Sequence, residues 1–180
     1  MADVWREIYR GRVLHVLECD VDLPNGARTT LEIVRHPGAA AIVPFLNDAE
    51  ILLVRQYRFA AGGYLLEVPA GKLDPGERPD ACAARECEEE VGHRPARLEK
   101  IGAILTTPGF SDEVIHLYAG FDLTESRTAH EDDEVIAVER VTLADAVRMV
   151  ESGEITDGKT VSALLLAARR WPAVTRAPAG

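Results

Sequence analysis

The chain has 180 residues, of which 47% are hydrophobic and 28% are charged, and this composition fits one globular domain with its own core. The net charge of −10 argues against a nucleic-acid partner, which requires a basic surface, although a small anionic substrate neutralised by bound cations is compatible with it. The three cysteines lack zinc-ligand spacing, and no stretch reaches the roughly 18 apolar residues of a membrane helix. We therefore predict a cytoplasmic protein with free thiols and no membrane partner.

The first part of the chain has the alternating pattern of β-strands. Strands are predicted over residues 12–23, 27–36, 39–45, 50–57 and 64–69. The first two flank a Pro-Asn-Gly turn, which predicts a hairpin within an N-terminal β element. The third and fourth predict a second strand pair around Asn47 and Asp48.

A helix is predicted over Pro79–Val91, because a Pro suits its first turn and Gly92 stands where it would stop. Further strands are predicted over residues 98–105, 114–121 and 134–141, and two helices over 142–152 and 160–171. Thr142 or Leu143 caps the first of these helices. This order of elements predicts an α+β fold in which helices enclose a mixed sheet.

Three glutamates of the central helix, Glu86, Glu89 and Glu90, follow the i, i+3, i+4 spacing that places side chains on one helical face. Carboxylates so placed repel each other by about a few tenths of a kcal/mol per pair, unless a cation or a basic partner lies between them. Oxygen ligands at this density suit Mg²⁺ or Mn²⁺. An isolated acidic run is more often solvated surface, so the surrounding pattern decides between the two interpretations.

The glutamates belong to a longer pattern of fixed spacing. Gly71 is followed after five residues by Glu77, after seven more by Arg85-Glu86, and then by Glu89-Glu90 and Gly92. This order resembles the Nudix box, and all seven of its charged and glycine positions match. The departures are Cys87, where Leu is usual, and His93, at the closing aliphatic position. Neither position supplies a ligand in the family.

The resemblance implies a Nudix-type α/β/α sandwich that uses Mg²⁺ or Mn²⁺ to hydrolyse a diphosphate linkage. The metal ligands that it implies are Ala70, through its carbonyl, and Glu86, Glu89 and Glu90. It also implies that Arg85 pairs with Glu77 and orients the loop between them, a task that suits the fork-shaped guanidinium. Cations at this place would neutralise the diphosphate and lower the pKa of a bound water.

The loop at residues 106–113, TTPGFSDE, narrows the subfamily. In Nudix enzymes that resemble ADP-ribose pyrophosphatases, a Pro follows the box by about sixteen residues, and Pro108 lies sixteen after Gly92. Glu113 matches the acidic residue that can reach the metal-bound water, and Asp112 is a lower-ranked candidate. By itself the loop would be a turn with exposed acids. Both Glu89 and Glu113 remain candidates for the general base.

Substrate-binding residues are also implied by the resemblance, which extends over residues 30–170. Arg58 is the candidate phosphate-binding cation, with Arg35 and Arg55 as weaker alternatives. Glu67 and Pro108 are expected to contact substrate, and Glu67 alternatively metal. An aromatic ring in the N-terminal region, Trp5 or Tyr9, is expected to stack on the base across a dimer interface.

These inferences divide the chain into an N-terminal β element, residues 1–38, which forms a homodimer, and a Nudix hydrolase domain, residues 39–175. The leading hypothesis is Mg²⁺-dependent hydrolysis of ADP-ribose or a related ADP-sugar to AMP and a sugar phosphate. Another nucleoside diphosphate sugar such as GDP-mannose, or an oxidised nucleotide, is the alternative substrate. The alternative from another functional class is a Nudix module that senses a nucleotide without cleaving it. A third hypothesis is a helix that binds Ca²⁺ or Mg²⁺ only structurally, but the EF-hand loop pattern that such a site would have is absent.

Overall fold

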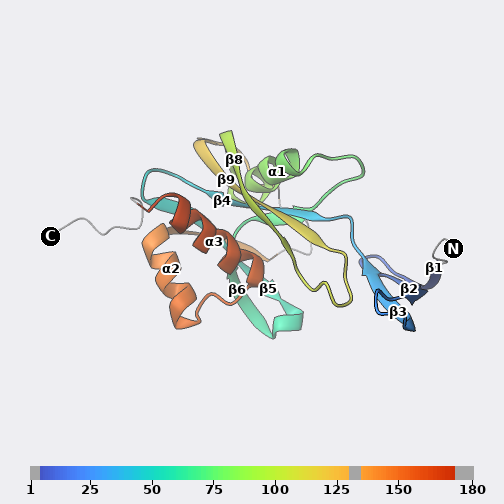
Figure 1. Ribbon diagram of the computed structural model, residues 1–180. Coiled ribbons are helices and arrows are strands. Elements are labelled where there is room, and N and C mark those ends of the chain that lie inside the picture. The colour runs from blue at the N-terminus through green and yellow to red at the C-terminus, as the bar shows by residue number, and fades with distance from the viewer. Residues whose placement is uncertain (1–4, 130–134, 173–180) are drawn as a thin grey trace.

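The computed structural model describes residues 5–129 and 135–172. Its strands are β1 (Trp5–Arg10), β2 (His15–Asp22), β3 (Arg28–Arg35), β4 (Ala39–Pro44), β5 (Glu50–Arg58), β6 (Gly63–Glu67), β7 (Ala70–Lys72), β8 (His93–Leu105), β9 (Val114–Glu125) and β10 (Ile136–Thr142). Its helices are η1 (Phe59–Ala61), α1 (Pro79–Val91), α2 (Leu143–Ser152) and α3 (Gly158–Arg170). Figure 1 shows a body of sheets and helices and a smaller sheet beside it.

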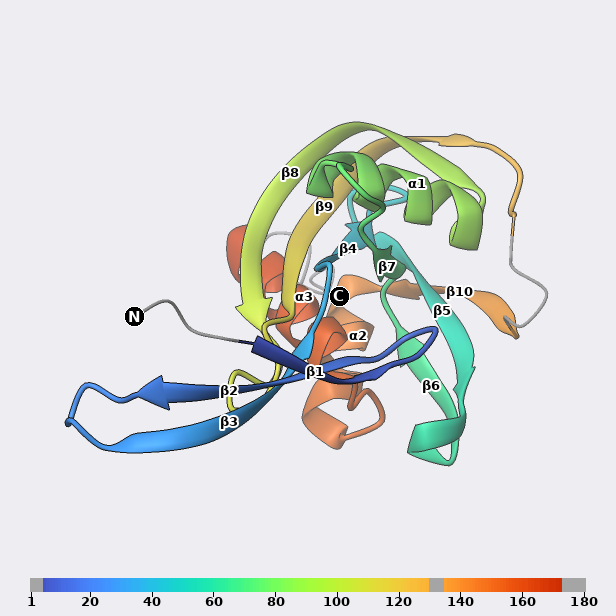
Figure 2. The same cartoon turned by 90° about the vertical axis from the view of Figure 1, so that its right-hand side faces the viewer.

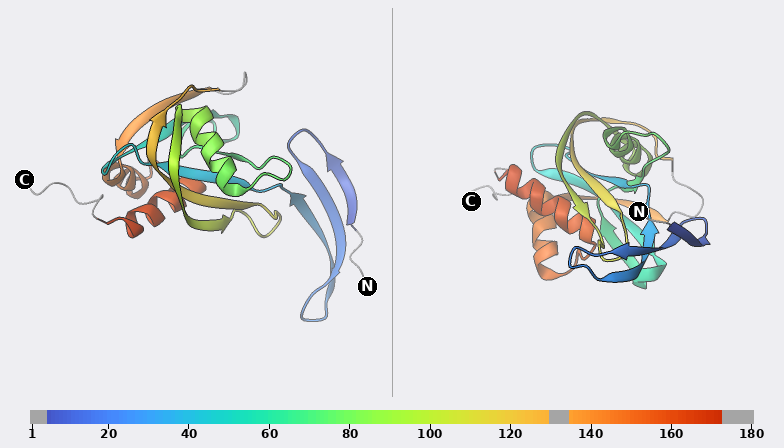
Figure 3. Two further views of the ribbon diagram at one scale, coloured as in Figure 1. Left: turned by 90° about the horizontal axis from the view of Figure 1, so that it is seen from above. Right: turned by 45° about the vertical axis from the view of Figure 1, so that its right-hand side comes forward.

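The smaller sheet contains β1, β2 and β3 in that order, all antiparallel. The predicted hairpin is present, since β2 pairs with β3 up to Asp22 and Arg28 around the turn at Gly26, whose φ is +83°. The sequence analysis did not delimit β1, which pairs with the other edge of β2. Figure 3 shows that this sheet projects from the body and is joined to it where β3 leads into β4.

The central sheet has the order β7-β4-β9-β8 and is mixed, because β4 is parallel to β9 and antiparallel to β7. Every residue of β4 is buried. Ala40 and Ile42 pack in the core that includes α1, whereas Ala39, Ala41 and Val43 pack with residues of α2 and α3. Helices therefore cover both faces of this sheet, as predicted and as Figures 1 and 2 show.

A second sheet, β10-β5-β6, corrects the prediction that residues 39–45 and 50–57 pair with each other. Strands β4 and β5 lie in different sheets, and an isolated bridge joins Phe45, which follows β4, to Ile51 of β5. The side chain of Asn47 accepts hydrogen bonds from the backbone N–H groups of Ala49 and Glu50 and shapes the connection. Because β4 and β5 are both largely buried, their pattern does not reveal which partners they take.

The remaining elements follow the prediction, with some longer strands. Strand β8 begins at His93 rather than at 98, because a Pro is tolerated in this edge strand, and β9 extends to Glu125 rather than ending at 121. Of the strand predicted over residues 134–141, position 134 lies outside the described residues, as do positions 173–175 of the predicted Nudix domain. None of the helices described is long and apolar enough to cross a membrane.

Candidate active site

The two glycines of the box have separate structural roles. A Cβ atom on Gly71 would lie 1.9 Å from Oε1 of Glu86, so any other residue here would displace the Glu86 carboxylate from its position against β7. Gly92 ends α1 with a φ of +66°, and its backbone N–H donates to the carbonyl groups of Cys87 and Glu88. The box spacing therefore sets β7 against the glutamate face of α1.

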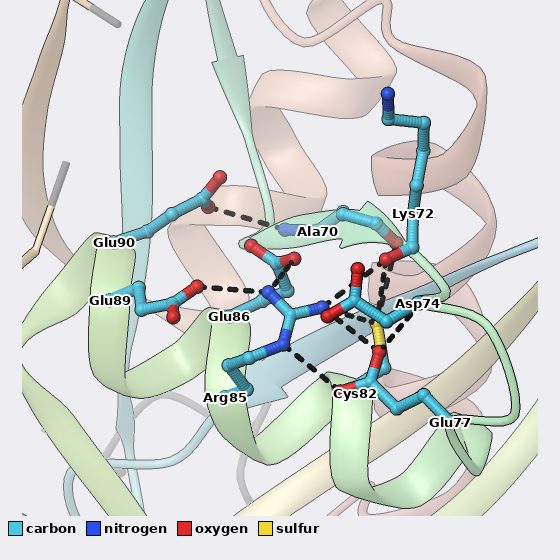
Figure 4. Close-up of polar contacts among 10 residues, drawn as sticks. Ala70, Lys72, Asp74, Glu77, Cys82, Arg85, Glu86, Glu89 and Glu90 are labelled. Carbon is cyan, nitrogen blue, oxygen red and sulfur yellow. Dashed lines mark hydrogen bonds and ion pairs between the residues drawn. The ribbon is translucent and has the colours of Figure 1, made fainter. Parts of the chain in front are cut away.

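Arg85 is the centre of the polar contacts between this helix and the preceding loop (Figure 4). Its Nε and Nη2 donate to the two oxygens of Glu77, both at 3.0 Å, so the predicted pair is bidentate. Its Nη1 donates to Glu86 at 2.6 Å and to Glu89 at 2.9 Å, and Nη2 donates to the carbonyl of Lys72 at 3.2 Å. The contacts with Glu86 and Glu89 were not predicted.

These contacts change the proton affinities of the groups involved. The hydrogen bonds from Arg85 lower the pKa of Glu77 from its ordinary value to about 2. The same bonds raise the pKa of Arg85. Burial, together with the nearby Glu86 and Glu77, raises the pKa of the Cys82 thiol to about 12, so this cysteine is a neutral packing residue.

The proposed metal ligands lie beside each other without forming a ready cage. Glu86 and Glu90 are buried, and Glu90 accepts a hydrogen bond from the backbone N–H of Ala70 at 3.2 Å. In this arrangement no three carboxylate, imidazole or thiol groups among the described residues converge on a point that could hold an ion. The donor set itself, carboxylates and a main-chain carbonyl, has the chemistry that a hard divalent cation requires. Binding would need Arg85 to give up contacts with Glu86 and Glu89.

A second charged cluster joins β5, β6 and the start of α3. Glu67 is 1% exposed, and its oxygens accept from Nε and Nη2 of Arg58 at 2.9 and 2.8 Å. Lys159 also donates to Glu67, and to Asp157 at 3.0 Å. Glu67, which was expected to contact substrate or metal, is buried in the structure and holds Arg58 and Lys159 through these bonds.

The loop between β8 and β9 carries Glu113 and is held in place by neighbouring residues. Glu113 accepts from Oγ1 of Thr106 at 2.8 Å and lies 3.4 Å from Nδ1 of His36. Asp112 accepts from Arg35 at 2.7 Å and from the backbone N–H of His36 at 2.8 Å. Arg35 is thus directed towards this loop.

A cavity of about 780 Å³ brings several of these residues together. Arg58 and Lys159 line it, and so do Glu113, Ala70 and Gly71. The glutamates of α1 lie next to this wall, since Glu90 bonds to Ala70 and Glu86 contacts Gly71. Such a volume and a few convergent polar groups are typical of a small-molecule site.

The remaining residues that were predicted to bind substrate do not line this cavity, and one residue that lines it was not predicted. Pro108 is exposed in the loop, Arg55 pairs with Glu139, and the guanidinium of Arg35 lies 4.6 Å from the centre of the Trp5 ring. Tyr9 is 57% exposed on β1. Lys159 was not predicted to have a role. No local pattern reveals its role, because its partner Glu67 lies 92 positions away in the sequence.

Comparisons with known proteins agree with this geometry. The family model described as the NUDIX domain matches residues 35–164. An ADP-ribose pyrophosphatase from Bacillus subtilis (strain 168) is 41% identical over 88% of this chain and 86% of its own length. A methanol dehydrogenase activator from Bacillus methanolicus has the same identity and coverage.

A solved structure described as that of an ADP compounds hydrolase superposes with a TM-score of 0.84, covers 98% of each chain and is 25% identical. The matched family model spans more than half of the chain, and the Bacillus subtilis relative is well above 30% identity over most of its length. The chain therefore belongs to the Nudix family.

Proposed function

We propose that this protein hydrolyses the diphosphate linkage of ADP-ribose or a related ADP-sugar, with Mg²⁺, to AMP and a sugar phosphate. The observation that carries the proposal is the cavity of about 780 Å³ that Ala70 and Gly71 line next to the glutamates of α1, with Arg58, Lys159 and Glu113 around it. The similarity to the ADP-ribose pyrophosphatase of Bacillus subtilis supports the adenine nucleotide as the substrate class.

Nudix hydrolases generally use divalent metals, and we propose Mg²⁺, or Mn²⁺ in its place, as the ion. Glu86, Glu89, Glu90 and the carbonyl of Ala70 are the residues that would hold it. When bound, the ion supplies charge neutralisation of the diphosphate and a water of lowered pKa. Arg85 bridges two of these glutamates and offsets their repulsion, since its Nη1 bonds to both Glu86 and Glu89.

The other residues bind substrate and move the proton. The guanidinium of Arg58 neutralises phosphate oxygens, and Glu67 fixes its orientation through two hydrogen bonds. Glu113 accepts the proton of the attacking water, and its hydrogen bond with Thr106 positions the carboxylate. Glu89 is the alternative base, because Arg85 is the one group among the described residues that bonds to the Glu89 side chain.

We further propose that the N-terminal sheet forms the interface of a homodimer and that the protein acts in the cytoplasm. Large apolar side chains are exposed at this sheet, among them Ile8 of β1 and Val13 and Leu14 of the connection between β1 and β2. The three cysteines are buried and form no disulfide with one another, which supports a reducing compartment.

The test is incubation with ADP-ribose, ADP-glucose, GDP-mannose and 8-oxo-dGTP, with and without Mg²⁺, followed by chromatography of the products. We expect Mg²⁺-dependent release of AMP, fastest from ADP-ribose. Faster turnover of GDP-mannose or 8-oxo-dGTP would assign the alternative substrates. Binding of ADP-ribose without turnover of any of the four would favour a nucleotide-sensing module, and the name of the Bacillus methanolicus relative is a reason to include that outcome.

A further inference from the structure

Lys159 places a second cation on the wall of the cavity, outside the box and its loop. It follows the N-cap of α3, whereas Arg58, which lines the same cavity, ends β5. The Lys159 side chain is only 13% exposed. The fold therefore holds two cations side by side through one shared partner, Glu67.

Glu67 is ionised in this setting. Burial raises the pKa of its carboxyl, but the bonds and charges of Arg58 and Lys159 outweigh that effect and hold the pKa below its ordinary value. A carboxylate buried to this extent is costly unless its partners stay in place. It consequently works as a fixed anchor that orients both cations at the cavity.

Counting donors shows what the two cations have left to offer. An ammonium group has three N–H donors and a guanidinium group has five. Within the described residues, Lys159 uses two of its donors, on Glu67 and Asp157, and Arg58 uses two, both on Glu67. One N–H of Lys159 and three of Arg58 therefore remain for a ligand in the cavity that both residues line.

Asp157 does not cancel this positive charge on the cavity side. The oxygen that contacts Lys159 also accepts from the backbone N–H of Thr160 at 3.0 Å and from its hydroxyl at 2.6 Å. The carboxylate is thus engaged in capping α3, where the partial positive charge of the helix end balances it in part. Arg58 and Lys159 face Glu67 and Asp157, and the helix end adds about half a positive charge to this wall.

We propose that Lys159 is a substrate-binding residue, which binds a non-bridging oxygen of the substrate's diphosphate together with Arg58. The identity of the diphosphate as part of a nucleoside diphosphate rests on the proposed function. Two oriented cations suit a diphosphate better than they suit a neutral sugar, because each cation can pair with a separate anionic oxygen. The site thereby selects for the linkage itself, whichever group lies beyond it.

The test uses ADP as a probe, because ADP carries the diphosphate without a second sugar. Its Kd is measured by calorimetry with Mg²⁺ for the parent protein, for Lys159→Met and for the control Lys100→Met, whose ammonium faces His116 on the central sheet. Loss of one charged hydrogen bond should weaken ADP binding by about tenfold in Lys159→Met. Lys100→Met should bind like the parent. Equal Kd values for all three proteins would overturn the proposal.

A second measurement on the unmodified protein covers the case in which Lys159→Met does not fold. The sequence contains three lysines, Lys72, Lys100 and Lys159, so acetylation of each can be followed by mass spectrometry. ADP should slow the acetylation of Lys159 and leave that of Lys100 unchanged. Acetylation of Lys159 at the same rate with saturating ADP would contradict the assignment.

Turnover separates this proposal from the proposed function. If the parent protein binds ADP but hydrolyses none of the nucleotide sugars, the proposed function is wrong. The comparison of the Kd for ADP between the parent and Lys159→Met still decides the role of Lys159. If Lys159→Met raises the KM for ADP-ribose at unchanged ADP affinity, Lys159 contacts the sugar, and the diphosphate assignment is wrong.

Discussion

Glu90 and Glu113 are the two carboxylates on which the proposed chemistry depends most, and their surroundings differ. Glu90 is 4% exposed and bonded to the backbone of Ala70. Glu113 lines the cavity and is held by a hydroxyl group. We expect Glu113→Gln to lower kcat by about 10²-fold, at the low end for loss of a general base, because a metal-bound water keeps part of its reactivity.

Glu90→Gln should lower kcat further than Glu113→Gln, because a lost ligand weakens the hold on the cation itself. The two variants are compared in steady-state kinetics over a series of Mg²⁺ concentrations. Only Glu90→Gln should recover partly at high Mg²⁺. Parent-like activity of Glu90→Gln would exclude its assignment as a ligand.

The pair of Arg85 and Glu77 predicts a specific pH dependence of stability. The pKa of Glu77 is about 2 in the folded protein against an ordinary value of 4.5, because Arg85 bonds to it. A lowered folded pKa means that the contribution of Glu77 is fully present above pH 4.5 and is lost as the pH falls towards 2. In urea unfolding, the parent should therefore lose stability more steeply than Glu77→Gln across this window. Parallel curves would contradict the prediction.

Helix periodicity predicts from the sequence that Glu86, Glu89 and Glu90 lie on one face, and the resemblance to the Nudix box implies their roles. The role of Arg85 as a partner of two of these glutamates could not be predicted, since it depends on side-chain conformation. Lys159 was missed for a different reason. It meets Glu67 across 92 positions of sequence, and no local pattern shows that the end of β6 and the start of α3 adjoin.

Elements defined by local signals were predictable in the same way. Helix α1 has a proline at its start and Gly92 at its end, and its bounds were predicted without error. The pairing of β4 and β5 was predicted wrongly, because neighbours in sequence usually pair and buried apolar strands carry no signal for their partners. The first residues of β8 were missed because Pro95 reads as a break, although an edge strand tolerates it.

The loop at residues 106–113 depends on β3 for its position. Arg35 binds Asp112, and the backbone of Val34 donates to Phe110 at 2.7 Å and accepts from Asp112 at 3.3 Å. We expect Arg35→Ala to loosen this loop, and with it Glu113. Because the ion pair is partly exposed, hydrogen exchange of the loop amides should accelerate by only about two- to fivefold, with a similar fall in kcat.

Arg28→Ala is the matched control for this change, because Arg28 is also in β3 but pairs with Asp22 at 3.6 Å near the hairpin turn. Its loop exchange and kcat should equal those of the parent. Unchanged exchange in Arg35→Ala would show that the backbone bonds from Val34 suffice to hold the loop.

The whole molecule has an uneven distribution of exposed apolar surface. Ile8, Tyr9, Val13 and Leu14 of the N-terminal sheet region each expose half or more of their surface. This sheet projects from the body in Figure 3, and a three-stranded sheet with so much apolar exposure is marginal without a partner surface. A second copy of the chain would cover it.

The dimer can be tested by placing charges on this surface. Burying Glu side chains at Ile8 and Leu14 in an interface would cost several kcal/mol, about enough to dissociate a micromolar dimer, so Ile8→Glu with Leu14→Glu should sediment as a monomer. Phe59→Glu is the control, since Phe59 is 88% exposed but lies in the short η1 turn between β5 and β6, outside the N-terminal sheet. If the parent protein sediments as a monomer at micromolar concentration, the proposed dimer does not form. If the double variant stays dimeric, the interface lies elsewhere.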